Sequence, residues 1–428
     1  MKNRKIKDVL LMLLLYIYFF VITYFAIANY DVIWNYGFAY NVAKGLKMYN
    51  DFNMVITPLY PIVFGIILKI FGCNMIIFYL FNALIPVIMF YLIHKFYKNA
   101  LLEVVILTAI VSGPNYNTLC LLFLFILMIL EDKKQNDYII GIVLGLVFLT
   151  KSSMGLLSLA SIYYIKDVKK IIKRVVGFLI PNMIIIVYFI KDKIFMNYLN
   201  YAFGSLISFG KDNFSFSFGI LIEVGIVIYL IYIYFKKKDI KVLYILFFQI
   251  MSYPIFNGIH VIFSIIPVVF YVVYSNQNII YKKYRKYLAV AIITPLFLTV
   301  VQQMTIDMDY GSHALKNKLI EKRYIDGANN IKNCVENLDN TYFVMYEAYY
   351  DKLLLGIKIN QYDLILTGNL GYNGEKRVIE YFDSLPSNTQ FIVHKEYGGG
   401  HLSKEVYDHI KKKYQLYKTF SIYEVYVK

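Results

Sequence analysis

The sequence predicts an α-helical polytopic membrane protein that carries a small C-terminal α/β domain. Of the 428 residues, 59% are hydrophobic, and long apolar runs recur up to about residue 304. A soluble protein of this length would not be so apolar along most of its chain, whereas membrane helices need such runs. Beyond residue 304 the composition becomes polar and mixed. We therefore expect a membrane domain at residues 1–304 and a domain outside the membrane at residues 305–428.

About eleven apolar runs are predicted to be transmembrane helices. The first follows a basic start and could be read as a signal peptide. Its apolar part, residues 9–28, exceeds the about 7–15 residues of a usual signal core, which favours an uncleaved helix. The predicted spans are about 8–28, 75–93, 101–113, 117–130, 138–150, 153–165, 175–190, 217–235, 242–256, 258–275 and 287–304.

Loop charges set the predicted orientation and decide whether the ambiguous apolar run at 57–72 crosses the membrane. If it does not cross, the clusters of basic residues at 95–98, 133–134, 166–174, 236–241 and 282–286 all lie on the side of the N-terminus. That arrangement is the one that the positive-inside rule gives for cytoplasmic loops. The formal charge of +16 is therefore a topology signal and does not indicate nucleic-acid binding.

Residues 57–72 are accordingly predicted to form a helix in the outer membrane interface, entered through Pro58 and Pro61. This helix lies within a large first outer loop, residues 29–74. The protein is then a multi-pass protein of the cell membrane in contact with its lipids. Its N-terminus is cytoplasmic and its C-terminal domain is extracytoplasmic.

The C-terminal domain is expected to mix helices and strands. Helices are predicted near 314–337, 374–384 and 403–414, and strands near 341–346, 362–367, 389–394 and 416–427. The only cysteines, Cys73, Cys120 and Cys334, have a spacing that fits neither a metal site nor a disulfide framework.

Polar side chains collect at the predicted outer ends of the spans, whereas the inner loops carry mainly lysines. This distribution indicates a functional site at the outer membrane surface. The candidates are Asp31, Asp51, Asn115, Tyr116, Asn117, Lys151, Glu223 and His260.

Each candidate also has a purely structural reading. Asp31 could be the first solvated residue after a span, and Asp51 could cap a turn. Asn115 and Asn117 could cap the next span, and His260 could be a helix-end polar residue.

Two candidates lie in less polar surroundings. Glu223 could be a functional intramembrane carboxylate or could form a buried hydrogen bond to a neighbouring helix. Lys151 is harder to explain structurally, because a cation on the outer side opposes the topology rule, although it could snorkel to lipid headgroups. In the C-terminal domain, the run "EYGGGHLSKE" could cradle a phosphate or form a flexible loop, and it lacks the full P-loop pattern.

Two short runs carry a family resemblance. One has the pattern G-x-x-Y-x-D-F…P-L, formed by Gly45, Tyr49, Asp51, Phe52, Pro58 and Leu59. The other has the pattern G-L-x-F-L-T-K, formed by Gly145, Leu146, Phe148, Leu149, Thr150 and Lys151. With the early Asp31, they resemble the GT-C superfamily of polyprenyl-phosphate-sugar glycosyltransferases, in its protein mannosyltransferase-like and rhizobial lipopolysaccharide glycosyltransferase-like branches.

The resemblance implies a GT-C-like membrane domain, a catalytic carboxylate at Asp31 and a lipid-phosphate contact at Lys151. Many relatives carry an acidic pair in the first outer loop, whereas Asp31 is followed by Val32. Many also carry an acid in the second outer loop, where this chain has "NYN" at 115–117. Because amides are poorer ligands for hard cations than carboxylates, the sequence does not support a divalent metal, and no cofactor is predicted.

The expected activity is transfer of a sugar from a polyprenyl-phosphate donor to a glycan, lipid or protein acceptor of the cell envelope, with inversion. Asp31 would be the general base and Asp51 would orient the acceptor or the loop. Lys151 and His260 would hold the phosphate. Candidates for substrate contacts are Tyr49, Asn115, Tyr116, Asn117 and Glu223.

Two alternatives remain open at this point. A transporter or flippase for a lipid-linked polysaccharide would tend to place polar breaks near the bilayer midplane and to show internal repeats. A polysaccharide polymerase would share the outer site.

Overall fold

The computed structural model describes residues 2–26, 29–97, 113–214, 216–256, 258–275, 306–335, 338–399 and 402–428. The chain forms two compact units. The helical unit contains residues 1–26, 79–188 and 215–305, and the mixed unit contains residues 27–78, 189–214 and 306–428. The whole of the predicted first outer loop, residues 29–74, thus shares a unit with the C-terminal α/β residues.

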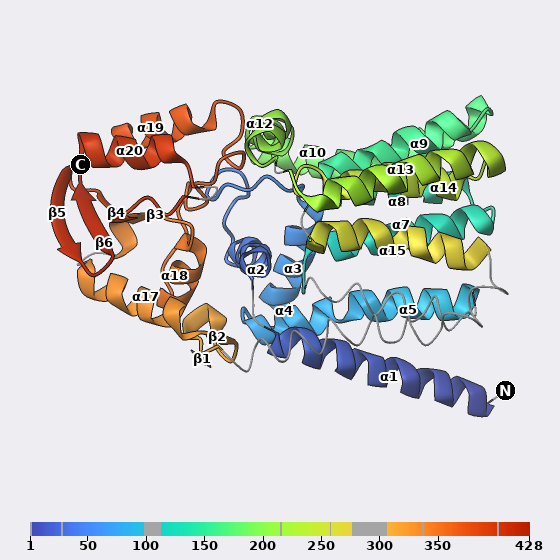
Figure 1. The fold of residues 1–428 in the computed structure, drawn as a ribbon, viewed down its shortest axis with the longest axis horizontal. Coiled ribbons are helices and arrows are strands. Elements are labelled where there is room, and N and C mark those ends of the chain that lie inside the picture. The colour runs from blue at the N-terminus through green and yellow to red at the C-terminus, as the bar shows by residue number, and fades with distance from the viewer. Residues whose placement is uncertain are drawn as a thin grey trace. The chain divides into compact units, whose positions relative to one another are not determined.

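The helical unit consists of apolar helices of different lengths (Figure 1). Four of the described helices or helix pairs are long and apolar enough to cross a membrane: α1, α4 with α5, α10 and α13. The predicted spans near 101–113 and 287–304 lie outside the described residues, apart from Gly113. The helices are α1 (Lys2–Phe25), α4 (Met75–Asn82), α5 (Leu84–Phe96), α7 (Tyr116–Asp132), α8 (Asp137–Thr150), α9 (Leu156–Tyr164), α10 (Val168–Lys191), α13 (Phe218–Lys237), α14 (Ile240–Phe248) and α15 (Gly258–Ser275).

The outer surfaces of these helices are apolar. Only 11% of the most apolar window of α1, and the same share of α13, is buried within the protein. Leu14 on α1 is 65% exposed and Ile228 on α13 is 63% exposed. Such continuous apolar surfaces are unfavourable in water and are expected where lipid tails are the solvent. The helical unit therefore has the surface of a membrane protein.

Small residues let two helices of the unit pack closely. α8 and α10 approach each other at Gly141, Gly145 and Gly177, where an added Cβ would collide with the backbone of the facing helix. At Gly145 that Cβ would lie 2.6 Å from the carbonyl oxygen of Phe178. Glycine at helix contacts is a common packing device in membranes. Gly145, the glycine of the G-L-x-F-L-T-K run, therefore helps to fix the position of α8, which ends beside Lys151.

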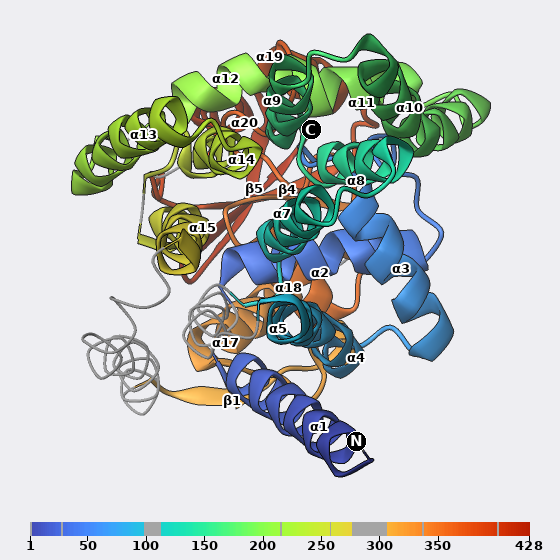
Figure 2. The ribbon, with the colours of Figure 1, turned by 90° about the vertical axis from the view of Figure 1, so that its right-hand side faces the viewer.

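A network of partly buried ion pairs joins the end of α7 to residues near the starts of α8, α10 and α14. Arg174 of α10 lies 2.5 Å from a carboxylate oxygen of Glu131 on α7 and 2.8 Å from one of Asp137 on α8. Lys241 of α14 pairs with Asp132. Buried charges are tolerated when they are paired and hydrogen-bonded in this way. Figure 2, viewed nearly along the helices, shows α7 among α5, α8, α14 and α15, with which it is in contact.

In the mixed unit, α2 (Tyr30–Ala43) packs along α3 (Leu59–Phe71). Their connection reverses direction at Gly45, whose φ of +83° favours glycine. At 13 residues, α3 is about 20 Å long, which is shorter than the ~30 Å hydrocarbon core. Residues 189–214 add α11 (Phe195–Leu199), a π-helical turn (Asn200–Gly204) and α12 (Ser205–Asp212).

The C-terminal part of the mixed unit is built on a four-stranded sheet with strand order β3-β4-β6-β5. β3 (Thr341–Val344) runs parallel to β4 (Gln390–His394), and β6 (Tyr423–Val427) is antiparallel to β4 and to β5 (Gln415–Phe420). A small antiparallel pair, β1 (Met308–Tyr310) and β2 (Leu319–Glu321), precedes it. The helices are α17 (Lys322–Cys334), α18 (Ala348–Leu355), α19 (Gly374–Ser384) and α20 (Lys404–Lys413).

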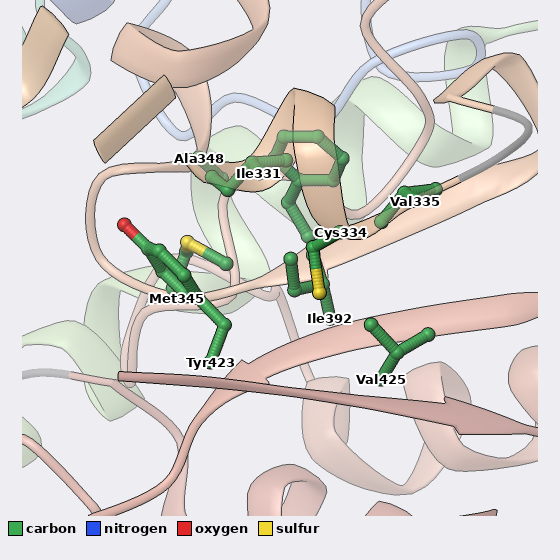
Figure 3. Close-up of a cluster of buried hydrophobic side chains, with 9 residues drawn as sticks. Ile331, Cys334, Val335, Met345, Ala348, Ile392, Tyr423 and Val425 are labelled. Atoms are coloured by element: carbon green, nitrogen blue, oxygen red, sulfur yellow. The ribbon is translucent and has the colours of Figure 1, made fainter. Parts of the chain in front are cut away.

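A hydrophobic cluster joins α17 and α18 to this sheet (Figure 3). Ile331 and Cys334 of α17 pack against Ile392 of β4 and Val425 of β6. All four side chains are at most 2% exposed. The buried Cys334 acts here as a small apolar residue.

The fold class is confirmed in part, as a mostly helical protein with long apolar helices and a small C-terminal mixed sheet. The strands expected near 341–346 and 389–394 and the helices expected near 374–384 and 403–414 are present. The strand expected at 362–367 is wrong: Tyr362 has a φ of +127°, and only Leu366 forms an isolated bridge, to Leu402.

Two further expectations need correction. The helix expected at 314–337 is limited to Lys322–Cys334, because residues before it form β2. The single strand expected at 416–427 is a hairpin, which turns at Ser421 with a φ of +52°.

Candidate functional site

Lys151 is held at the end of α8 by groups from two other helices. Its backbone leaves the helix with an extended φ of −153°. Its Nζ lies 3.4 Å from Oδ1 of Asn117, 3.4 Å from the carbonyl oxygen of Met251 and 3.2 Å from Sδ of Met251. The same ammonium lies 5.7 Å from the ring centroid of Tyr116, a cation–π distance. The side chain is thus directed into the helical unit and half-buried.

The start of α7 brings two of these partners into place. Asn115 caps the helix, because its Oδ1 accepts hydrogen bonds from the backbone N–H groups of Asn117, at 2.9 Å, and Thr118, at 3.2 Å. Tyr116 and Asn117 therefore begin the first turn beside Lys151. His260, in the first turn of α15, is close enough to Lys151 for the two to interact electrostatically. We call Tyr116, Asn117, Lys151, Met251 and His260 the lysine cluster.

Glu223 lies in the interior of the helical unit and joins two helices. Its side chain on α13 is 4% exposed and accepts a hydrogen bond from Oγ of Ser264 on α15. Ser264 lies about one turn beyond His260. Nε2 of Gln249 donates to the carbonyl oxygen of Ser264 at 3.2 Å. The interhelical hydrogen bond, one of the two readings open from the sequence, is therefore present.

Asp31 lies in the first turn of α2 and its side chain is exposed. Asn29 caps the helix by accepting from the backbone N–H of Val32 at 2.9 Å, and a carboxylate in a first turn is favoured by the helix dipole. Asp31 directly follows Tyr30, whose ring packs against that of Tyr346. Burial, with a smaller contribution from the Asp31 charge, raises the pKa of Tyr346 to about 12.

Asp51 and Tyr49 shape the turn between α2 and α3. The Asp51 carboxylate accepts from the backbone N–H of Lys47 at 2.7 Å and from Nδ2 of Asn50 at 2.9 Å. Tyr49 is fully buried, has a φ of +64° and donates its hydroxyl to the carbonyl oxygen of Ile56 at 2.8 Å. Tyr49 and Asp51, two residues of the first motif, therefore stabilise the conformation of this loop.

Sequence reasoning missed two sets of groups. Met251 contributes a backbone oxygen to the lysine cluster, and nothing in its apolar surroundings marks it. Glu347 lies just beyond the end of β3 and His394 is the last residue of β4. Oε2 of Glu347 lies 3.3 Å from Nε2 of His394. Since the carboxyl ends of adjacent parallel strands meet at one edge of a sheet, recognising β3 and β4 as parallel neighbours would have placed them together.

Within the described ranges, no group of three or more His, Cys, Asp or Glu side chains is arranged to hold a metal ion. In comparisons with known proteins, no family model and no curated protein matches the chain.

Proposed function

We propose that this protein is an integral membrane glycosyltransferase that moves a sugar from a polyprenyl-phosphate donor to an acceptor of the cell envelope. The observation that carries the proposal is the lysine cluster. A half-buried ammonium beside an amide, a ring face and a histidine, at the end of apolar helices, suits an anionic headgroup whose tail lies in lipid. The two motif resemblances and the apolar surface of the helical unit support the same class.

The proposed reaction is a displacement at the anomeric carbon. The acceptor oxygen forms a bond to that carbon as the bond to the phosphate oxygen breaks, and the electron pair leaves with polyprenyl phosphate. The acceptor proton passes to the Asp31 carboxylate, which acts as general base. Lys151 and His260 stabilise the charge that develops on the phosphate. Attack opposite to the leaving group inverts the anomeric centre.

The finer topology belongs to this proposal. It has about eleven spans, a cytoplasmic N-terminus and an extracytoplasmic C-terminal domain, with α3 lying in the outer interface. The basic loops support that last assignment, because they all lie on the side of the N-terminus only if α3 does not cross the membrane. The network around Arg174 and Lys241 would then lie at the cytoplasmic ends of the spans, beside the basic loops.

The experiment is a transfer assay with the purified protein in proteoliposomes. A polyprenyl-phosphate sugar with a radiolabelled sugar is supplied together with an extract of envelope acceptors. We expect label to move from the lipid to a glycan, lipid or protein fraction, with release of polyprenyl phosphate. Movement of intact sugar-lipid across the bilayer without cleavage would instead identify a flippase. Addition of repeated oligosaccharide units would identify a polymerase.

A further inference from the structure

The mixed unit contains a cavity of about 700 Å³ at the carboxyl ends of β3 and β4. Residues at the end of β4 or shortly beyond the ends of the two parallel strands form much of its wall. We call it the strand-end pocket; its lining includes Tyr346, Glu347, His394, Glu396, Gly398 and Leu402. The crevice beyond the carboxyl ends of parallel strands is a common place for ligands, and the volume lies in the usual range of small-molecule sites, roughly 300–1,000 Å³.

Two polar groups of the pocket are fixed by hydrogen bonds. Glu347 pairs with Nε2 of His394 at 3.3 Å and accepts from the hydroxyl of Tyr30, on α2, at 3.4 Å. Burial alone would raise the pKa of Glu347, but the contacts with His394 and Tyr30 outweigh it and lower the pKa. The carboxylate is thus ionised at neutral pH, and its side chain retains 29% exposure. It is a positioned acceptor for hydroxyl donors.

One side of the pocket is aromatic. Tyr346 packs against Tyr30, with 4.3 Å between ring centroids, and against Trp34, with 5.7 Å between them. Both partners belong to α2. The face of an aromatic ring is electron-rich and attracts the polarised C–H groups of a ligand. The pocket therefore combines a flat apolar surface with charged hydrogen-bonding groups.

The charges of the lining favour a neutral ligand over a phosphate. Glu347 and Glu396 contribute two carboxylates to the lining, which also contains Lys395 and His394. An anion would face repulsion from both acids. A sugar meets the opposite conditions, because its hydroxyls donate to carboxylates and its ring offers C–H groups to an aromatic face. From the sequence, the glycine-rich run could cradle a phosphate or form a flexible loop. In the structure, Gly398 and Gly399 line a pocket whose wall suits a polyol.

We propose that the strand-end pocket binds a saccharide unit of the acceptor, with Glu347 and His394 bonded to its hydroxyls and Tyr346 packed against its ring. The inference rests on the proposed function and narrows the acceptor class to glycans or glycosylated molecules. Asp31, the proposed base, belongs to the same unit and directly follows Tyr30, whose ring packs against Tyr346.

The chain's only tryptophan is Trp34, so its fluorescence reports on this pocket without any label. The protein is placed in nanodiscs without maltoside or glucoside detergents, because their headgroups are sugars. It is then titrated with mono- to trisaccharides of glucose, galactose, mannose and N-acetylglucosamine. We expect a saturable change in Trp34 emission with at least one of them. Glu347→Gln and His394→Gln should each weaken that affinity at least about tenfold, whereas Tyr372→Ala, an exposed tyrosine of the same unit, should not.

Several results would overturn the inference. One is the absence of an emission change with every sugar. Another is a sugar affinity in both variants equal to that of the wild type. A third is a saturable change with inorganic phosphate alone. Two variants are used so that one test survives if the other does not keep the wild-type unfolding temperature. The titration needs no donor and no turnover. Sugar binding without transfer would therefore refute the proposed function but support the pocket as a sugar site. Transfer without sugar binding would support the proposed function and refute the sugar site.

Discussion

Nζ of Lys151 lies 3.4 Å from Oδ1 of Asn117, although 34 residues separate them in sequence. The amide oxygen of Asn117 is a polar partner for the ammonium. Because the amide is uncharged, this contact does not neutralise the positive charge of Lys151. A carboxylate at the same place would form an ion pair, and the cation would attract an anionic ligand less strongly. The uncharged partner is thus consistent with a lysine that serves a phosphate.

This relationship gives a direct prediction for Asn117→Asp. The new carboxylate should pair with Lys151 and raise the KM for the polyprenyl-phosphate donor about tenfold, equivalent to ~1.4 kcal/mol. High salt should reduce the difference, because it screens partly exposed pairs. Donor titrations of the transfer rate measure both effects. Asn74→Asp is the control, since Asn74 accepts from the backbone N–H of Ile77 at 3.1 Å and aspartate caps equally well. An unchanged KM in Asn117→Asp would contradict the prediction.

The lysine cluster shows what could be predicted of the site and what could not. Lys151 is notable in the sequence because a lysine in a short predicted outer turn opposes the positive-inside rule. Tyr116 and Asn117 are notable because they stand at the start of a predicted span. Their contact with Lys151 depends on how α7 and α8 pack, and sequence periodicity alone does not fix that. Met251 had no signal, because it acts through a backbone oxygen and a sulfur.

Asp31 and Asp51 are predicted to differ when each is changed to asparagine. Asp31 is exposed in the first turn of α2, so Asp31→Asn should fold normally and lose roughly 10²–10⁴-fold in turnover, as expected for a missing general base. Asp51 closes its turn through the N–H of Lys47, and an amide oxygen can accept that bond. Asp51→Asn should therefore keep most of the activity. Transfer rates with near-normal expression measure this. Full activity in Asp31→Asn with an inactive Asp51→Asn would reverse the two roles.

The topology is predicted to place the ends of α7 and α13 inside the cell and α20 outside. Single cysteines are introduced by Lys134→Cys, Lys237→Cys and Lys412→Cys, at exposed positions, after Cys73, Cys120 and Cys334 are replaced by alanine. An impermeant thiol reagent applied to intact cells should label only the Lys412→Cys protein. Permeabilised cells, in which all three should react, provide the control. Labelling of either of the first two in intact cells would reverse the orientation.

The C-terminal sheet could be predicted only where local pattern and tertiary structure agree. The apolar runs that form β3 and β4 have turn residues on either side, and both strands were predicted. α18 was missed because its eight residues include Asp351 and Lys352, which read as polar. In the structure both are buried, and Lys352 forms a 2.6 Å ion pair with Asp363. The backbone before Asp363 turns instead of extending, since Tyr362 has a φ of +127°.

The Asp351 carboxyl is predicted to lower the free energy of unfolding as the pH rises. Burial, with the Glu347 charge second, raises the pKa of its carboxyl well above the usual range. The folded state therefore keeps a proton that the unfolded chain releases above about pH 4, and the free energy of unfolding falls as the pH rises toward the folded-state pKa. Asp351→Asn removes this loss, so its apparent unfolding temperature in nanodiscs at pH 8 should exceed that of the wild type, by about 2–4 °C per kcal/mol.

Asp383→Asn is the matched control with the opposite sign. Burial would raise the pKa of Asp383, but hydrogen bonds from Lys413, His409 and Tyr414 outweigh it and lower the pKa to about 2. Its contribution to stability is present above about pH 4 and is lost as the pH falls toward 2. Asp383→Asn should therefore lower the unfolding temperature at pH 8. Destabilisation by both variants to the same degree would mean that Asp351 is ionised in the folded protein.

The most direct test of the central claim is the donor kinetics of Lys151→Gln beside Lys151→Arg. Glutamine can still meet Asn117 but has no charge, whereas arginine keeps the charge with a different shape. We predict that kcat/KM for a polyprenyl-phosphate sugar falls about 10²-fold or more in Lys151→Gln. Lys151→Arg should keep a substantial part of the activity, and Lys69→Gln, at an exposed lysine of α3, should keep all of it. A fall in kcat as well as a rise in KM would show that the lysine stabilises the departing phosphate. Wild-type kinetics in Lys151→Gln would contradict the account, because the cation would then have no part in binding or releasing the lipid phosphate.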